Sequence, residues 1–238
     1  MSLVSVYIGS SLCEKQVFSI IRHSNAICSR IIMQNYLLYT FEILLVLVIP
    51  LLILYLKGNW PLRKIIPCLF IIPIIWYFAY SPIHELSHAA GIYLAGGKVI
   101  VWKLIPRFWM GEFAQAWVKA SGITQNWQQI MMTGFPYLID LICLKISILV
   151  FRKSNTRNPL WLGMAFMMLC LRPAMDFIFE PIAYFTGDKN DFYALQQIMG
   201  TIGIRTFVIA SMGFAGYTIV SSLKQLISNS KSENVPTI

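Results

Sequence analysis

The sequence predicts an all-α polytopic membrane protein with about five transmembrane helices and a small β-hairpin-like segment. Of its 238 residues, 57% are hydrophobic and only 12% are charged, whereas about a quarter of the residues of a typical soluble domain are charged. Several apolar runs also approach the roughly 20 residues that a helix needs to cross a bilayer. Once these runs are assigned to spans, no remaining segment is long enough for a separate soluble domain.

Five apolar runs are the expected spans. They are Tyr36–Tyr55, Ile65–Tyr80 with its continuation toward Leu94, Ile130–Phe151, Leu160–Phe179 and Thr206–Leu223. Accordingly, we expect residues 1–35 to be an N-terminal arm, residues 36–226 to be one transmembrane domain and residues 227–238 to be a C-terminal tail.

One segment between the second and third spans differs in character from the rest. Residues 97–120 have the sequence "GKVIVWKLIPRFWMGEFAQAWVKA". Both ends partly alternate and are rich in β-branched or aromatic residues, and Pro106 and Gly111 lie between them, which favours two short strands in a hairpin. A plain interfacial loop is the alternative.

The charge pattern fits a membrane protein better than a nucleic-acid-binding protein. The formal net charge is +9, but lysines and arginines such as Arg152 and Lys153 lie in short loops between apolar runs, where membrane proteins carry them. We therefore expect the lipid bilayer, and no nucleic acid, as a partner. The five cysteines show no CxxC spacing, so no disulfide framework or cysteine metal site is indicated.

Three titratable side chains stand inside the apolar stretch "SPIHELSHAAG", residues 81–91. Ser81 and Pro82 suit an N-cap and a first helical turn, so we expect a new or kinked helix to begin there. His84 and His88 are then four residues apart and lie on one face of the helix.

This spacing matches the HExxH arrangement of zinc hydrolases. Two imidazoles one turn apart can both reach a Zn²⁺ ion at about 2.0–2.1 Å. Glu85, one position after His84, cannot easily join the same ligand set, but it can take a proton from a water molecule at the ion. The alternative is a buried histidine pair that backbone carbonyls or neighbouring spans satisfy. Ionisable groups at membrane depth are costly and usually functional, which favours the metal site.

A catalytic zinc ion normally has a third protein ligand, and here a carboxylate is expected. The candidates are Asp140, Asp176, Glu180, Asp188 and Asp191, with Glu42 and Glu112 less plausible. Asp176 follows Arg172 by four residues, which suggests an ion pair instead. Asp140 is followed five residues later by Lys145, a less regular pairing distance. The two late aspartates suit N-capping of a helix as well as metal binding.

Three stretches of the chain resemble the site-2 protease family of intramembrane zinc metalloproteases. They are "HELSHAAGIYLAGGKVIVWKL", "MMTGFPYLIDLICLKISIL" and "GDKNDFYALQQIMG". The second resembles the family's Gly-Pro-containing span, although Phe135 separates the two residues here. The third resembles the late aspartate at a helix start in short bacterial forms. The Asn-x-x-Pro and Asp-Gly patterns of the family are absent. The chain is similar to short forms without the PDZ domain that many relatives carry.

The resemblance implies that His84 and His88 bind Zn²⁺ and that Glu85 is the general base. A late aspartate would be the third ligand, and we favour Asp191 over Asp188 because an apolar helix follows it. The implied function is that of a zinc-dependent endopeptidase in a bacterial cytoplasmic membrane.

This enzyme would hydrolyse peptide bonds in or near the transmembrane segments of membrane-protein substrates. An edge strand of residues 97–120 would hold the unwound substrate extended. The main alternative function is a non-catalytic membrane protein with a structural or vestigial metal site. Three histidines are too few for a membrane di-iron desaturase. The two histidines in expected spans, His84 and His88, share one span, which argues against a metal transporter.

Overall fold

A computed structural model describes residues 40–41, 43–105, 116–153, 158–187 and 190–232. Two compact units, Met1–Phe41 and Glu42–Ile238, make up the chain, and every helix and strand named below belongs to the second unit. The expected N-terminal arm, the third-ligand candidates Glu42, Glu112 and Asp188, and the turn of the expected hairpin lie outside the described residues.

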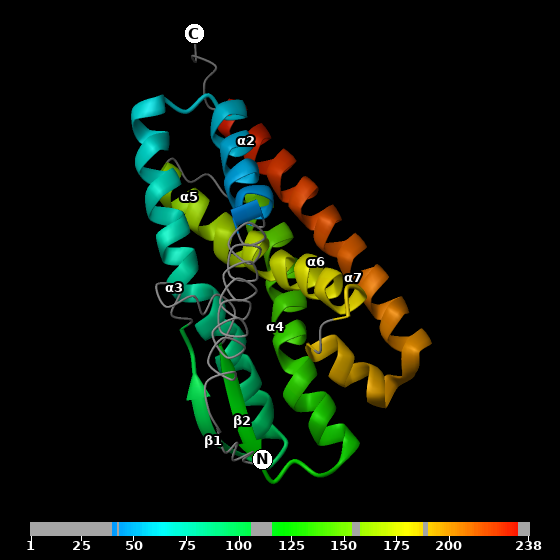
Figure 1. The fold of residues 1–238 in the computed structure, drawn as a ribbon. Coiled ribbons are helices and arrows are strands. Elements are labelled where there is room, and N and C mark those ends of the chain that lie inside the picture. Colours follow the sequence, from blue (N-terminus) through cyan, green and yellow to red (C-terminus); the bar gives the residue numbers. More distant parts are fainter. Residues whose placement is uncertain (1–39, 42, 106–115, 154–157, 188–189, 233–238) are drawn as a thin grey trace, which may run out of the picture. The chain divides into compact units, whose positions relative to one another are not determined.

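The described chain is mostly helical, as the composition predicts (Figure 1). Four helical segments are long and apolar enough to cross a membrane: Leu62–Leu94, Asn126–Lys153, Pro159–Phe185 and Asp191–Asn229. Each contains one of the expected spans. The first expected span, Tyr36–Tyr55, overlaps the helix Ile43–Lys57, which is apolar but too short to meet the same criterion.

The elements follow in a simple order. A π-helical segment, Ile43–Val48, leads into α2 (Ile49–Lys57), and α3 (Leu62–Leu94) is followed by β1 (Lys98–Lys103) and β2 (Trp117–Ser121). Helix α4 spans Asn126–Lys153. A continuous helix then consists of α5 (Pro159–Phe166), a π-helical turn (Met167–Leu171) and α6 (Arg172–Phe185), and α7 (Asp191–Ser232) completes the described chain. Residues 227–232, expected to belong to the tail, are thus helical.

Of the expected new or kinked helix at Ser81–Pro82, the new helix is wrong, because both residues lie in the interior of α3. Proline in an apolar helix leaves one carbonyl without its usual partner, but neighbouring helices can satisfy the freed group. The helix ends in a Schellman motif, in which Gly97 N–H donates to Ile92 O (2.9 Å) and Gly96 N–H donates to Tyr93 O (3.0 Å). Gly96 has φ +78°, a conformation that glycine adopts without strain.

The predicted β-hairpin is confirmed as a two-stranded antiparallel sheet with a register shift between Val99 and Val101. It follows α3 directly and returns to the start of α4. There the Gln128 side chain accepts hydrogen bonds from two backbone N–H groups before α4 and donates to Ala95 O at 2.8 Å. This contact ties the start of α4 to the end of α3.

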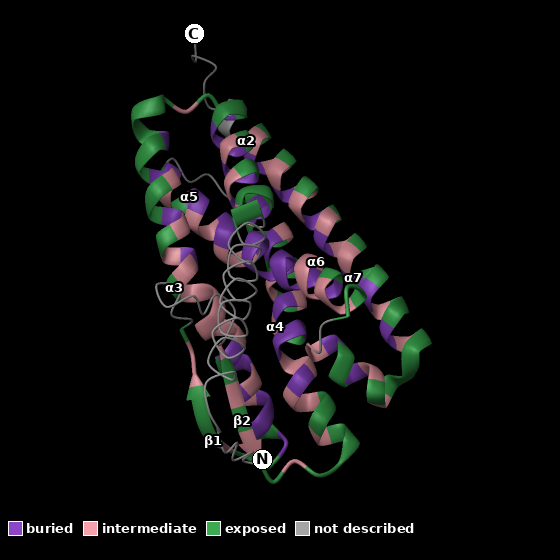
Figure 2. Ribbon diagram, in the orientation of Figure 1, coloured by how far each residue is buried: buried purple, intermediate pink, exposed green. Residues whose placement is uncertain are grey.

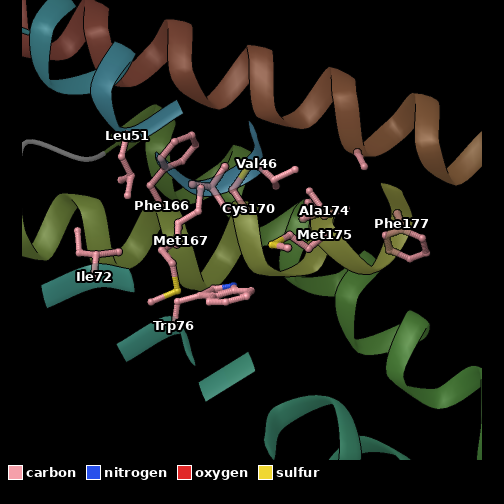
Figure 3. Packing of buried hydrophobic residues seen from close by; sticks show 14 of the residues in the cluster. Val46, Leu51, Ile72, Trp76, Phe166, Met167, Cys170, Ala174, Met175 and Phe177 are labelled. Carbon is pink, nitrogen blue, oxygen red and sulfur yellow. The ribbon is translucent and has the colours of Figure 1, made fainter. Parts of the chain in front are cut away.

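The helix Pro159–Phe185 is the most enclosed of the four long segments. In its most apolar window 67% of the residues are buried, against 22–33% in the other three, and the buried positions concentrate along α5 and α6 (Figure 2). Its side chains, including Phe166, Met167 and Phe177, belong to one hydrophobic core (Figure 3). Asn158 caps its first turn by accepting hydrogen bonds from Leu160 N–H and Trp161 N–H.

Helix α7 consists of two parts that meet at Gly200. This residue has φ 77° and ψ 162°, values that interrupt the helix, and the chain changes direction there (Figure 1). The short first part begins at Asp191, as the sequence predicts. Asn190 caps it by accepting a hydrogen bond from Tyr193 N–H at 3.3 Å and anchors it by donating to Glu180 O at 2.6 Å.

Close packing around Gly163 supplies a test of this core. The Tyr55 hydroxyl donates a 2.7 Å hydrogen bond to Pro159 O, and a Cβ atom at Gly163 would lie 2.1 Å from that hydroxyl oxygen and 2.5 Å from Ile72 Cδ1. Gly163→Ala should therefore lower the free energy of unfolding by about 1–3 kcal/mol through overpacking, measured by denaturation in mixed detergent micelles.

Gly216→Ala is the matched control, because a Cβ atom at Gly216 in α7 would meet no atom within 4 Å. Replacing a helical glycine by alanine in open space should be neutral or stabilising by up to about 1 kcal/mol. Equal stability of the two variants would contradict the described packing of α5 against α2 and α3.

Candidate metal centre

Helix α3 presents its two histidines to one point. His84 and His88 are four residues apart on the same face, and their Nε2 atoms lie 3.1 Å from each other. The side chains are only 12% exposed. The spacing predicted from the sequence thus places two imidazoles together, and the rings meet edge to face.

The start of α7 brings a carboxylate to the same point. Asp191 Oδ2 lies 2.9 Å from His88 Nε2 and 3.5 Å from His84 Nε2. Asp191 follows the cap residue Asn190, whose hydrogen bond to Glu180 O fixes this end of α7 against α6. Of the third-ligand candidates that the structure describes, Asp191 is the one next to both Nε2 atoms, and Asp188 lies outside the described residues.

The Nδ1 atom of each histidine contacts an oxygen atom outside the group formed by His84, His88 and Asp191. His84 Nδ1 lies 3.2 Å from Asp176 Oδ2, and His88 Nδ1 lies 2.8 Å from Met132 O. A carboxylate and a carbonyl oxygen can only accept, so both Nδ1 atoms must carry the proton. In neutral imidazoles this leaves a lone pair on each Nε2 atom.

With both imidazoles neutral, three electron-rich atoms face one another with no donor between them. Two Nε2 lone pairs and a carboxylate oxygen repel unless a positive charge lies between them. Two ligands of a tetrahedral Zn²⁺ ion at 2.0–2.1 Å would be about 3.3–3.4 Å apart, close to the observed Nε2–Nε2 distance of 3.1 Å. The donor set and this distance are compatible with a divalent metal ion. The metal-free alternative is an ion pair in which a protonated His88 donates to Asp191 Oδ2 at 2.9 Å.

A buried charged network supports His84 from behind. Asp140, Arg172 and Asp176 are at most 2% exposed. Arg172 contacts Asp140 through Nη2 and lies 3.6 Å from Asp176 Oδ2 through Nη1. The predicted ion pair between Arg172 and Asp176 is confirmed. The predicted partner of Asp140, Lys145, is wrong, because Lys145 is exposed and five residues place it on a different face of α4.

In the part of the chain that the structure describes, two groups of side chains have metal-ligand spacing: His84, His88 and Asp191, and His84, Asp140 and Asp176. The Arg172 guanidinium contacts both carboxylates of the second group and offsets their negative charge. Its contact with His84 is through Nδ1, the nitrogen that faces away from Asp191. We therefore assign it as the hydrogen-bonding surroundings of the first group, which commonly orient metal-binding histidines.

Two tyrosines complete the surroundings of the centre, and sequence reasoning missed both. Tyr80 donates to Asp176 Oδ1 at 2.5 Å, and Tyr137 donates to Asp191 Oδ2 at 3.5 Å. Tyr80 precedes His84 by four residues and so shares its helix face, which is a signal that the sequence does contain. Tyr137 comes from α4, and nothing in its local pattern indicates this contact.

Glu85 is the remaining residue of the HExxH motif. It is 8% exposed, and its carboxylate interacts electrostatically with His84, His88 and Asp191. Glu180, one turn after Asp176 on α6, interacts electrostatically with His84 and Asp191. It does not belong to either group with metal-ligand spacing in the described chain.

Comparison of the chain with family models, with curated proteins and with solved structures finds no match.

The buried network makes a direct prediction for stability. Arg172→Leu would leave Asp140 and Asp176 buried without their cation, and removal of one partner from a buried ion pair costs about 3–5 kcal/mol. Lys145→Leu, which removes an exposed lysine, should change the free energy of unfolding by less than about 0.5 kcal/mol. Denaturation of both variants in detergent micelles measures the difference, and equal stabilities would show that Arg172 does not compensate these carboxylates.

Proposed function

We propose that this chain is a multi-pass membrane protein of the site-2 protease kind, a zinc-dependent endopeptidase that hydrolyses peptide bonds in or near transmembrane segments. The observation that carries the proposal is the convergence of His84 Nε2, His88 Nε2 and Asp191 Oδ2 beside Glu85. These are the residue types of a zinc hydrolase, and they come from one HExxH helix and one distant aspartate.

Exposed apolar surface supports the membrane part of the proposal. Phe70, Ile74 and Phe78 succeed one another every four residues along α3 and are 69%, 58% and 54% exposed. Such a stripe on one face of a helix is costly in water and favourable against lipid chains. We propose that the four long helices cross the bilayer and that the buried charges lie inside their bundle.

The donor set supports zinc as the ion. Two imidazole nitrogens and one carboxylate oxygen are typical of catalytic zinc sites, in which three protein ligands leave one position open. His84, His88 and Asp191 would hold the ion. When bound, Zn²⁺ polarises a carbonyl group and acidifies water next to it.

Glu85 would transfer the proton that hydrolysis requires. Its place next to His84 on α3 puts its carboxylate beside the histidines but outside their ligand set. It would accept a proton from water as the water oxygen joins the scissile carbonyl carbon. It would then deliver this proton to the amine nitrogen as the C–N bond breaks. The Asp191 side chain retains 27% exposure, so its carboxylate is not fully enclosed.

The β1–β2 hairpin would hold the substrate. In the described chain the sheet has two strands, so each strand has an outer edge that can pair with a further strand. A helical substrate hides its carbonyls in its own hydrogen bonds and must unwind before cleavage. Pairing with an outer edge of the hairpin would keep the unwound segment extended.

Co-expression with candidate single-span membrane proteins tests the activity. Glu85→Gln should reduce the cleavage rate by about 10²–10⁴-fold, the usual contribution of a general base, while its zinc content stays that of the native chain. His84→Ala should lose both zinc and cleavage. His23→Ala, which removes the histidine outside the motif, is the matched control and should keep both.

Cleavage of a substrate by the Glu85→Gln protein at the native rate would contradict the proposed mechanism. Normal biological activity of that variant, with zinc bound and no cleavage by the native chain, would favour the alternative of a structural metal site.

A further inference from the structure

One proline of α4 lies at a position where it affects a neighbouring helix. Pro136 is in the interior of α4, four residues after Met132. In an α-helix the N–H of residue 136 would donate to the carbonyl of residue 132, but proline has no N–H. The Met132 carbonyl is therefore released from the helical hydrogen-bond pattern.

The released carbonyl is the one that His88 uses. Met132 O lies 2.8 Å from His88 Nδ1 across the α3–α4 contact. This bond places the proton on Nδ1 and leaves the lone pair of Nε2 for the centre formed with His84 and Asp191. The hydrogen bond thus fixes the ring orientation of His88 and the nitrogen that faces the centre.

A glycine brings the two helices close enough for this bond. Gly91 follows His88 by three residues and lies on the same face of α3. A Cβ atom there would lie 2.4 Å from Met131 O and 2.9 Å from Phe135 Cβ, both on the turn of α4 that carries Met132. Any larger residue at position 91 would force the two backbones apart at this point.

We infer that Pro136 and Gly91 are positioning residues of the metal centre, through the Met132 carbonyl and His88. Pro136 frees the carbonyl, and Gly91 lets α4 approach until the carbonyl meets the imidazole. The inference rests on the proposed zinc site and adds to it a reason why a proline stands in an otherwise apolar helix.

Zinc affinity of the purified full-length chain tests the inference, measured by competition with a zinc-binding dye in detergent. In Pro136→Ala the new N–H competes with His88 for Met132 O. This variant should bind zinc about 10–100-fold more weakly, the usual effect of losing such a supporting bond. The unfolding midpoint of its zinc-free form should not fall, because alanine restores the helical hydrogen bond.

Pro73→Ala is the matched control, since Pro73 also lies inside a long helix. The carbonyl that Pro73 releases is not the acceptor of either histidine, because these contact Asp176 and Met132 O. Its zinc affinity should equal that of the native chain. Gly91→Ala approaches the same contact from α3 and should also weaken zinc binding, whereas Gly216→Ala, with open space around it, should not.

Each outcome has a definite meaning. Native zinc affinity in both Pro136→Ala and Gly91→Ala would overturn the inference and leave the proposed function standing. Weaker binding accompanied by a lower unfolding midpoint of the zinc-free Pro136→Ala protein would also overturn it, because the proline would then have a merely structural role. A native chain without measurable zinc affinity would refute the proposed function, and this inference with it.

Discussion

The feature on which the structure most depends is the commitment of both histidine Nδ1 atoms to acceptors. His84 Nδ1 contacts Asp176, and His88 Nδ1 contacts Met132 O. In the neutral imidazoles the two Nε2 atoms therefore direct their lone pairs toward each other and toward Asp191. In the proposed metal-bound form, a divalent cation between these three atoms offsets their repulsion. Four elements each supply one part of it: α3 the histidines, α4 the carbonyl, α6 the supporting carboxylate and α7 the third donor.

Buried charge is the second feature that these elements share. Asp140, Asp176 and Glu85 are buried together, and Arg172 is the cation among them. In a medium of low dielectric constant, unbalanced carboxylates are expensive, so carboxylates beside neutral histidines favour binding of a divalent cation. In the proposed metal site, the same network that orients His84 would also add to the attraction for the ion.

Sequence patterns predicted the features that depend on local spacing. The i,i+4 histidines, the helix start at Asp191, the hairpin and the Arg172–Asp176 pair were each accessible in this way. Patterns failed where contacts between distant segments decide the outcome. Ser81–Pro82 look like a helix start, but packing in an apolar bundle keeps α3 continuous. Asp140 pairs with Arg172, 32 residues away, and its sequence neighbour Lys145 is exposed. The contacts of Tyr137 and of the Met132 carbonyl likewise depend on how α4 packs, which no single stretch specifies.

The most direct measurement of the central claim is the zinc X-ray absorption spectrum of the purified chain, combined with its metal content. The account predicts one zinc ion per chain, with two imidazole nitrogens at about 2.0–2.1 Å and a carboxylate oxygen at about 2.0–2.2 Å. In His88→Ala half of the imidazole scattering should disappear from whatever zinc remains bound. A spectrum without imidazole scattering, or full zinc content in a chain that lacks both His84 and His88, would contradict the account.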